Sequence, residues 1–123
     1  MRSLLLALTL FCVSYASQRS HTGHLRHVVL IAFQEGTGPE QIAAAEQQAA
    51  ELADHIPEIL AYEWGTDITG AEIAAGFTHC LFVTFADNEG LQTYLPHPAH
   101  QAFVERHGPH FAKVLVVDYL ARD

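Results

Sequence analysis

Four short runs of β-branched and aromatic residues constrain the fold of this chain more than any other feature. They occupy residues 27–33, 59–64, 78–85 and 112–119, and glycine, proline or polar residues bound them. Short apolar runs of this kind, separated by turn-forming residues, are typical of β-strands. We therefore predict four strands.

The segment between the first two strands has a helical pattern. Thr37 and Glu40 fit a capping box, which predicts a helix from there to about His55, with Pro57 ending it. Its apolar residues recur at helical spacing, at Ile42, Ala45, Ala49, Leu52, Ala53 and Ile56. Residues 66–76 are predicted to form a loop between the second and third strands.

A second helical segment follows the third strand, and it is interrupted. Asp87 can cap a helix that runs to Tyr94 or Leu95. Pro96 and Pro98 then break it, because proline lacks the N–H donor and restricts the residue before it. A short helix over residues 99–107 is predicted to precede the last strand.

The element order is thus β-α-β-β-α-β, which predicts an α+β, ferredoxin-like fold. A weak internal repeat supports this order, since His27 and Phe33 of the first strand correspond to His79 and Phe85 of the third. We expect these two strands to be parallel neighbours. This arrangement would place His27 and His79 side by side at one end of the sheet.

The strands are apolar on both faces. Val28 alternates with Val29, and Val116 alternates with Val117, where a sheet covered on one side would alternate apolar with polar residues. Both helices should cover the same face, because the crossovers are right-handed. The second face then needs a cover, and a second copy is the simplest one. We expect a homodimer that forms a dimeric α/β barrel.

The chain is expected to have three parts. Residues 1–16 have the features of a signal peptide: Arg2, an apolar stretch over residues 4–13, and Ser14 and Ala16 before the expected cleavage site. That stretch is too short to span a bilayer, which takes about 20 residues. Residues 17–26 are predicted to be a flexible lead-in, and residues 27–123 the domain. The protein should be secreted or periplasmic.

The charge balance argues against two classes of partner. Six Lys and Arg residues face fourteen Asp and Glu residues, and the basic residues do not cluster. Binding to nucleic acid or to an anionic membrane surface requires a basic patch. We expect neither partner.

Histidine is the unusual component, with nine in the chain. Tyr94, His97 and His100 lie in a turn fixed by Pro96 and Pro98, and such a rigid turn can support a site. The alternative is a structural helix break with both histidines in solvent, and spacing alone leaves the two open. His97 and His100 have a metal-ligand spacing, but Pro98 lies between them and no carboxylate or cysteine is beside them, so we expect no metal.

These motifs resemble the stress-responsive A/B barrel (Dabb) family of dimeric ferredoxin-like proteins. The resemblance runs from His27 to Tyr119. Its most specific parts are Glu63-Trp64-Gly65-x-Asp67, Gly76-Phe77-Thr78-His79 and Tyr94-x-x-His97-Pro98-Ala99-His100-x-x-Phe103, with Asp118-Tyr119 at the end.

The resemblance implies a function. A plant polyketide cyclase of this family closes a linear polyketide by aldol condensation without a metal or organic cofactor. Its catalytic histidine and tyrosine fall on His100 and Tyr94, and its other pocket histidines fall on His27 and His79. The resemblance thus implies a cofactor-independent cyclase, lyase or isomerase acting on a small hydrophobic or carbonyl compound, with His100 as general base.

In this reading Tyr94 positions or stabilises the substrate oxygen, and His27, His79 and His97 bind substrate. The alternative is a non-catalytic ligand-binding or stress-response module. One departure concerns specificity, because Ala45, Glu46 and Ala49 stand where that cyclase has bulky aromatic residues. We expect a different substrate.

Overall fold

The computed structural model describes residues 22–122, which form four strands and three α-helices. The predicted signal peptide and the first half of the lead-in, residues 17–21, lie outside the described residues. In chain order the elements are β1 (Leu25–Phe33), α1 (Pro39–His55), β2 (Ala61–Thr66), β3 (His79–Phe85), α2 (Asn88–Tyr94), α3 (Pro98–His107), a 3-10 turn (Gly108–His110) and β4 (Phe111–Leu120).

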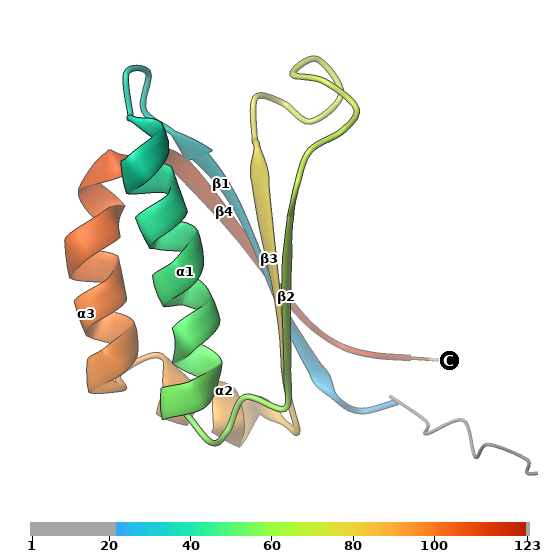
Figure 1. The fold of residues 1–123 in the computed structure, drawn as a ribbon. Coiled ribbons are helices and arrows are strands. Elements are labelled where there is room, and N and C mark those ends of the chain that lie inside the picture. The colour runs from blue at the N-terminus through green and yellow to red at the C-terminus, as the bar shows by residue number, and fades with distance from the viewer. Residues whose placement is uncertain (1–21, 123) are drawn as a thin grey trace, which may run out of the picture.

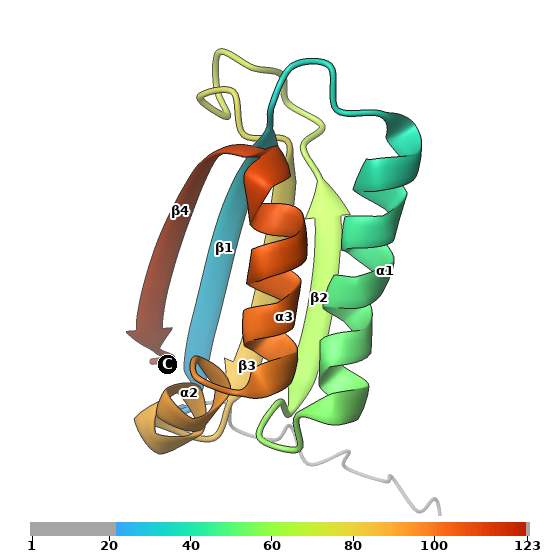
Figure 2. The same ribbon diagram turned by 90° about the vertical axis from the view of Figure 1, so that its left-hand side faces the viewer.

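The strands form one sheet in the order β2-β3-β1-β4, with every neighbouring pair antiparallel. Helices α1 and α3 lie side by side on one face of this sheet, and α2 lies near one end (Figures 1 and 2). Within residues 22–122, no helix lies on the opposite face (Figure 1). The predicted ferredoxin-like α+β fold is therefore confirmed.

The predicted relation between β1 and β3 is wrong. They are antiparallel, so His27 is paired with Val83, and His79 is paired with Ile31. The crossover through α1 makes β2 parallel to β1, and the direct connection to β3 then reverses the chain. His27 and His79 consequently lie at opposite ends of the shared ladder.

Two predicted boundaries also need correction. Gly38, not Thr37, is the N-cap of α1, and its N–H donates to the side chain of Gln41 at 3.1 Å. Thr37 instead donates its hydroxyl to the Gln34 carbonyl at 2.7 Å. Strand β1 begins at Leu25, which is buried, so the last two residues of the predicted lead-in belong to the sheet.

The core lies between the sheet and the helices. Phe85 and Ile56 are fully buried in it. The buried cluster also contains Leu25, Ala49, Leu52, Ile59, Val83, Leu91, Tyr94 and Phe103. Burying apolar side chains of this size contributes about 1.5–3 kcal/mol each, so this layer fixes the helices over the strands.

Strand β4 lies at the edge of the sheet, beyond the helices (Figure 2). Val114, Val116 and Val117 of this strand are each close to half exposed, on both faces of the sheet. Within residues 22–122, none of the helices is long and apolar enough to cross a membrane.

Candidate functional site

A cavity of about 240 Å³ lies between the sheet and the helices. Its lining combines apolar side chains with three residues predicted to form the site, His27, Tyr94 and His100. The apolar lining comes from both the sheet and the helices and includes Val29, Leu52, Leu81, Leu95, Val104, Val114 and Val116. A concave, mostly apolar site with a few convergent polar groups is the usual form of a small-molecule pocket.

The three polar residues lie in contact. The ring centroids of Tyr94 and His100 are 4.3 Å apart, and those of His27 and Tyr94 are 5.7 Å apart. Tyr94, the last residue of α2, therefore lies between a histidine of β1 and a histidine of α3. Burial raises the pKa of Tyr94 well above its usual value, so its hydroxyl remains a proton donor.

The break between α2 and α3 fixes the His100 ring. In a continuous helix the Leu95 carbonyl would accept from the N–H of Ala99. Here Ala99 N–H donates to Nδ1 of His97, the N-cap of α3, at 3.1 Å. The Leu95 carbonyl is left for Nδ1 of His100, at 2.9 Å.

This bond also determines where the His100 proton lies. A carbonyl oxygen can only accept, so Nδ1 of His100 must carry the proton. In the neutral ring, Nε2 is then unprotonated and able to act as a base. Burial lowers the pKa of His100, against an opposing effect of the Leu95 carbonyl, and the nearby His27 and His97 lower it further. The ring is thereby kept in its basic, neutral form.

His27 is held by a carboxylate. Its Nδ1 lies 2.5 Å from Oδ1 of Asp118, the residue paired with it on β4. The His27 side chain is nearly buried, whereas that of Asp118 is 38 % exposed. Because an ionised carboxylate only accepts, His27 donates from Nδ1, and its ring orientation is fixed.

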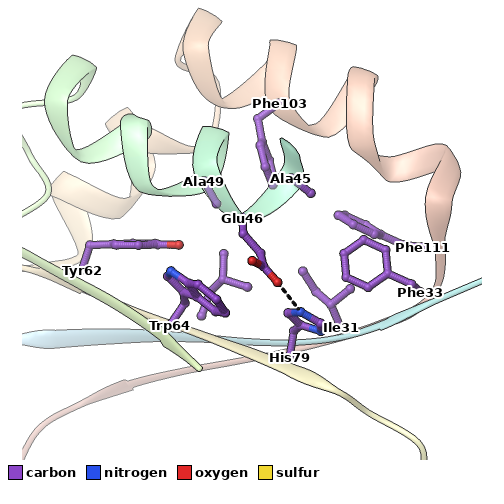
Figure 3. Close-up of a pocket in the computed structure, with 11 residues that line it drawn as sticks. Ile31, Phe33, Ala45, Glu46, Ala49, Tyr62, Trp64, His79, Phe103 and Phe111 are labelled. Carbon is purple, nitrogen blue, oxygen red and sulfur yellow. Dashed lines mark hydrogen bonds and ion pairs between the residues drawn. The ribbon is translucent and has the colours of Figure 1, made fainter. Parts of the chain in front are cut away.

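His79 lies elsewhere. It lines a small adjoining cavity of about 20 Å³ that shares several walls with the larger one (Figure 3). There its Nε2 is 2.9 Å from Oε1 of Glu46, and its ring stacks on Trp64. The structure therefore brings His27, Tyr94 and His100 together at the larger cavity and places His79 in the wall of the smaller one.

His97 has a structural position at the start of α3, and it is not among the residues that line either cavity. Conversely, sequence reasoning missed Asp118 and Tyr62 as site residues. Asp118 ended a matched motif, but its contact with His27 depends on strand register. The pairing of Glu46 with His79 likewise joins segments that are distant in sequence.

Among residues 22–122, no group of three or more His, Cys, Asp or Glu side chains is arranged to hold a metal ion. The polar side chains of the larger cavity are themselves suited to acid–base chemistry. His100 can accept a proton, and Tyr94 can donate a hydrogen bond beside it.

Two curated relatives are similar over most of their length. A stress-response A/B barrel domain-containing protein, HS1, from Arabidopsis thaliana is 35% identical over 79% of this chain and 89% of its own. Olivetolic acid cyclase from Cannabis sativa is 30% identical over 80% of this chain and 97% of its own.

Two solved structures illustrate the shared fold. Hydroxynitrile lyase from Passiflora edulis superposes with a TM-score of 0.76 at 25% identity, covering 83% of this chain and 96% of that one. A dimeric ferredoxin-like protein of unknown function from Thermobifida fusca gives a TM-score of 0.70 at 23% identity, covering 80% and 91%.

The model of the stress-responsive A/B barrel domain matches residues 25–121, which is nearly all of the described structure. With the relatives above, this match agrees with the motifs and with the strand order. The chain belongs to the stress-responsive A/B barrel domain family.

Proposed function

We propose that this protein is a cofactor-independent enzyme that removes a proton next to the carbonyl group of a small molecule. The reaction would be a cyclisation, a lyase cleavage or an isomerisation. Relatives named as a cyclase and as a lyase support this range. His100 is the general base and Tyr94 the hydrogen-bond donor.

The observation that carries the proposal is the state of the His100 ring. Its Nδ1–H is engaged by the Leu95 carbonyl, and its ring lies 4.3 Å from that of Tyr94 in the wall of a cavity. Nε2 of the neutral ring can take the proton from carbon. The Tyr94 hydroxyl can donate to the oxygen on which negative charge develops.

His27 supports the same step from the other side of Tyr94. Its ring is oriented by Asp118 and contacts Tyr94 edge to face. We propose that it binds the substrate oxygen together with Tyr94. The large apolar share of the lining suits a hydrophobic remainder of the substrate.

Proton exchange tests the elementary step without knowledge of the natural substrate. Unbranched methyl ketones are incubated with the protein in D₂O, and loss of the protons next to the carbonyl is followed by NMR. The wild type should accelerate exchange, and His100→Ala should lose roughly 10²- to 10⁴-fold of that acceleration. His55→Ala, at an exposed histidine of α1, is the matched control and should exchange as the wild type does.

Equal exchange by His100→Ala and wild type would contradict the base assignment. The second candidate function is a non-catalytic ligand-binding or stress-response module. The observation in its favour is that His79 is turned to Glu46 and is absent from the larger cavity. Ketone binding without any exchange would support it.

We also propose a homodimer. The exposed apolar side chains of β4 and the helix-free face of the sheet need a cover. The Thermobifida fusca protein, which shares the fold, is described as dimeric.

The export assignment is a proposal of the same kind. It is supported by the composition of residues 1–16, with Arg2 before an apolar stretch. N-terminal sequencing of protein from its native host should find Ser17 as the first residue. An intact Met1 on a cytoplasmic protein would contradict secreted or periplasmic localisation.

A further inference from the structure

The small cavity beside His79 adjoins the larger one. The two share six walls: Ile31, Ala49, Tyr62, Leu81, Phe103 and Phe111. Its volume of about 20 Å³ has room for one group of the size of a water molecule. Three polar side chains converge there within otherwise apolar surroundings, Glu46, Tyr62 and His79 (Figure 3).

Glu46 is held in place by its partner. Oε1 accepts a hydrogen bond from Nε2 of His79 at 2.9 Å, and the His79 ring is fixed between Trp64 and Phe33. The His79 and Glu46 side chains are 10% and 25% exposed. A carboxylate has more acceptor capacity than one bond uses, so Glu46 can accept a second donor.

The Tyr62 hydroxyl has no such partner. Its oxygen is buried without a hydrogen bond, and the side chain points from β2 toward Glu46 (Figure 3). Burial, and secondarily the charge of Glu46, raises the pKa of Tyr62 to about 12, so the group remains protonated. A buried hydroxyl without a partner is unfavourable and suits a position that a ligand group completes.

We infer that the small cavity beside His79 recognises a hydroxyl group at the end of the substrate remote from its carbonyl. This inference rests on the proposed function, which places the carbonyl at His100 and Tyr94. A hydroxyl donates to Glu46 and accepts from Tyr62, whereas an alkyl end leaves the Tyr62 hydroxyl unpaired and gives Glu46 no donor beyond His79. A primary ammonium pairs with Glu46 but offers Tyr62 no acceptor.

The register of the sheet sets the shape of this substrate. His27 is paired with Val83, which lies four residues from His79 along β3. A strand rises about 3.3 Å per residue, so the two ends of the substrate site are about 13 Å apart. The substrate is therefore elongated, with a carbonyl at one end, a hydroxyl at the other and an apolar segment between.

The test uses methyl ketones of increasing chain length that end in a hydroxyl, a methyl or an ammonium group. Trp64, the single tryptophan of the chain, lines the small cavity, so its fluorescence reports a ligand that reaches it. At the chain length that fits, the hydroxyl-ended ketone should bind the wild type at least about tenfold more tightly than its methyl-ended counterpart.

Substitution should reverse the preference. Glu46→Leu should favour the methyl-ended ketone, whereas Glu46→Gln, which keeps an acceptor, should retain part of the preference for the hydroxyl. Glu51→Leu, on the exposed part of the same helix, is the matched control and should leave the preference unchanged. Melting curves establish that each variant is folded. If Glu46→Leu does not fold, the comparison of Glu46→Gln with the wild type tests the inference.

The outcomes separate this inference from the proposed function. His100→Ala should lose proton exchange yet keep the tenfold preference for the hydroxyl. Equal binding of hydroxyl- and methyl-ended ketones by the wild type would overturn the inference and leave the catalytic proposal standing. Tighter binding of the ammonium-ended chain would overturn the hydroxyl assignment. Binding of none of the ketones would overturn both proposals.

Discussion

The protonation of one ring determines whether the site can act as a base. Partial burial of the ring favours neutral His100, and the bond from Nδ1 to the Leu95 carbonyl leaves Nε2 as the unprotonated nitrogen. A solvent-exposed histidine would be partly protonated near its ordinary pKa of about 6.5. A buried one retains its basic nitrogen to lower pH.

The pH profile of proton exchange should reflect this shift. Protonation removes the base, and the pKa of His100 is lowered, so the acid limb of the rate profile should have its midpoint below about 6.5. NMR titration of the His100 ring should give the same midpoint. A midpoint at or above 6.5 in either measurement would contradict the assignment of His100 as the buried base.

At the scale of elements, the break between α2 and α3 allows the Leu95 carbonyl to accept a hydrogen bond from His100. Pro98 disfavours helical backbone at the residue before it, and His97 indeed has a ψ of 135°. The break releases the Leu95 carbonyl from the helix ladder. A helix that ran through this segment would use that carbonyl for its own backbone.

Replacing Pro98 should therefore change the geometry of the site while the fold is retained. Pro98→Ala allows His97 to become helical and Leu95 to accept from Ala99, so His100 loses its partner. We expect proton exchange to fall at least about tenfold, with a change in the His100 tautomer seen by ¹⁵N NMR. The free energy of unfolding should change by no more than about 1 kcal/mol.

A matched control exists at the start of α1. Pro39 occupies the first turn of that helix, as Pro98 does in α3, but it lines neither cavity. Pro39→Ala should leave exchange unchanged. If Pro98→Ala also left exchange and tautomer unchanged, the break would have no part in positioning His100.

The sequence predicted the helices and strands better than it predicted how they lie relative to one another. Strands and helices followed from apolar spacing and from Asp87, whose side chain does accept from Gly90 N–H at 3.0 Å at the start of α2. The prediction that His27 lies beside His79 was wrong because the direction of a strand depends on the connections between strands, which the residues within the strand do not specify. The contact of His27 with Asp118 depends on a register between segments that are distant in sequence, which local patterns do not contain.

At the scale of the whole molecule, the fold covers one face of its sheet and leaves the other open. Alternation along β4 places Leu115, Val117 and Tyr119 on the face away from the cavity that Val114 and Val116 line. These three outward side chains are each 46–49% exposed. An apolar surface of this kind on a sheet and its edge is typical of an interface.

The mature protein should therefore be a dimer, and a charge on that face should dissociate it. Val117→Glu would bury a carboxylate between two copies, which is unfavourable without a partner for the charge, so light scattering should give the mass of one chain at micromolar concentration. Ile68→Glu makes the same kind of change in the loop after β2, at a side chain that is 96% exposed, and should remain dimeric. A wild type that runs as a stable monomer, or a Val117→Glu variant that stays dimeric, would show that this face is not the interface.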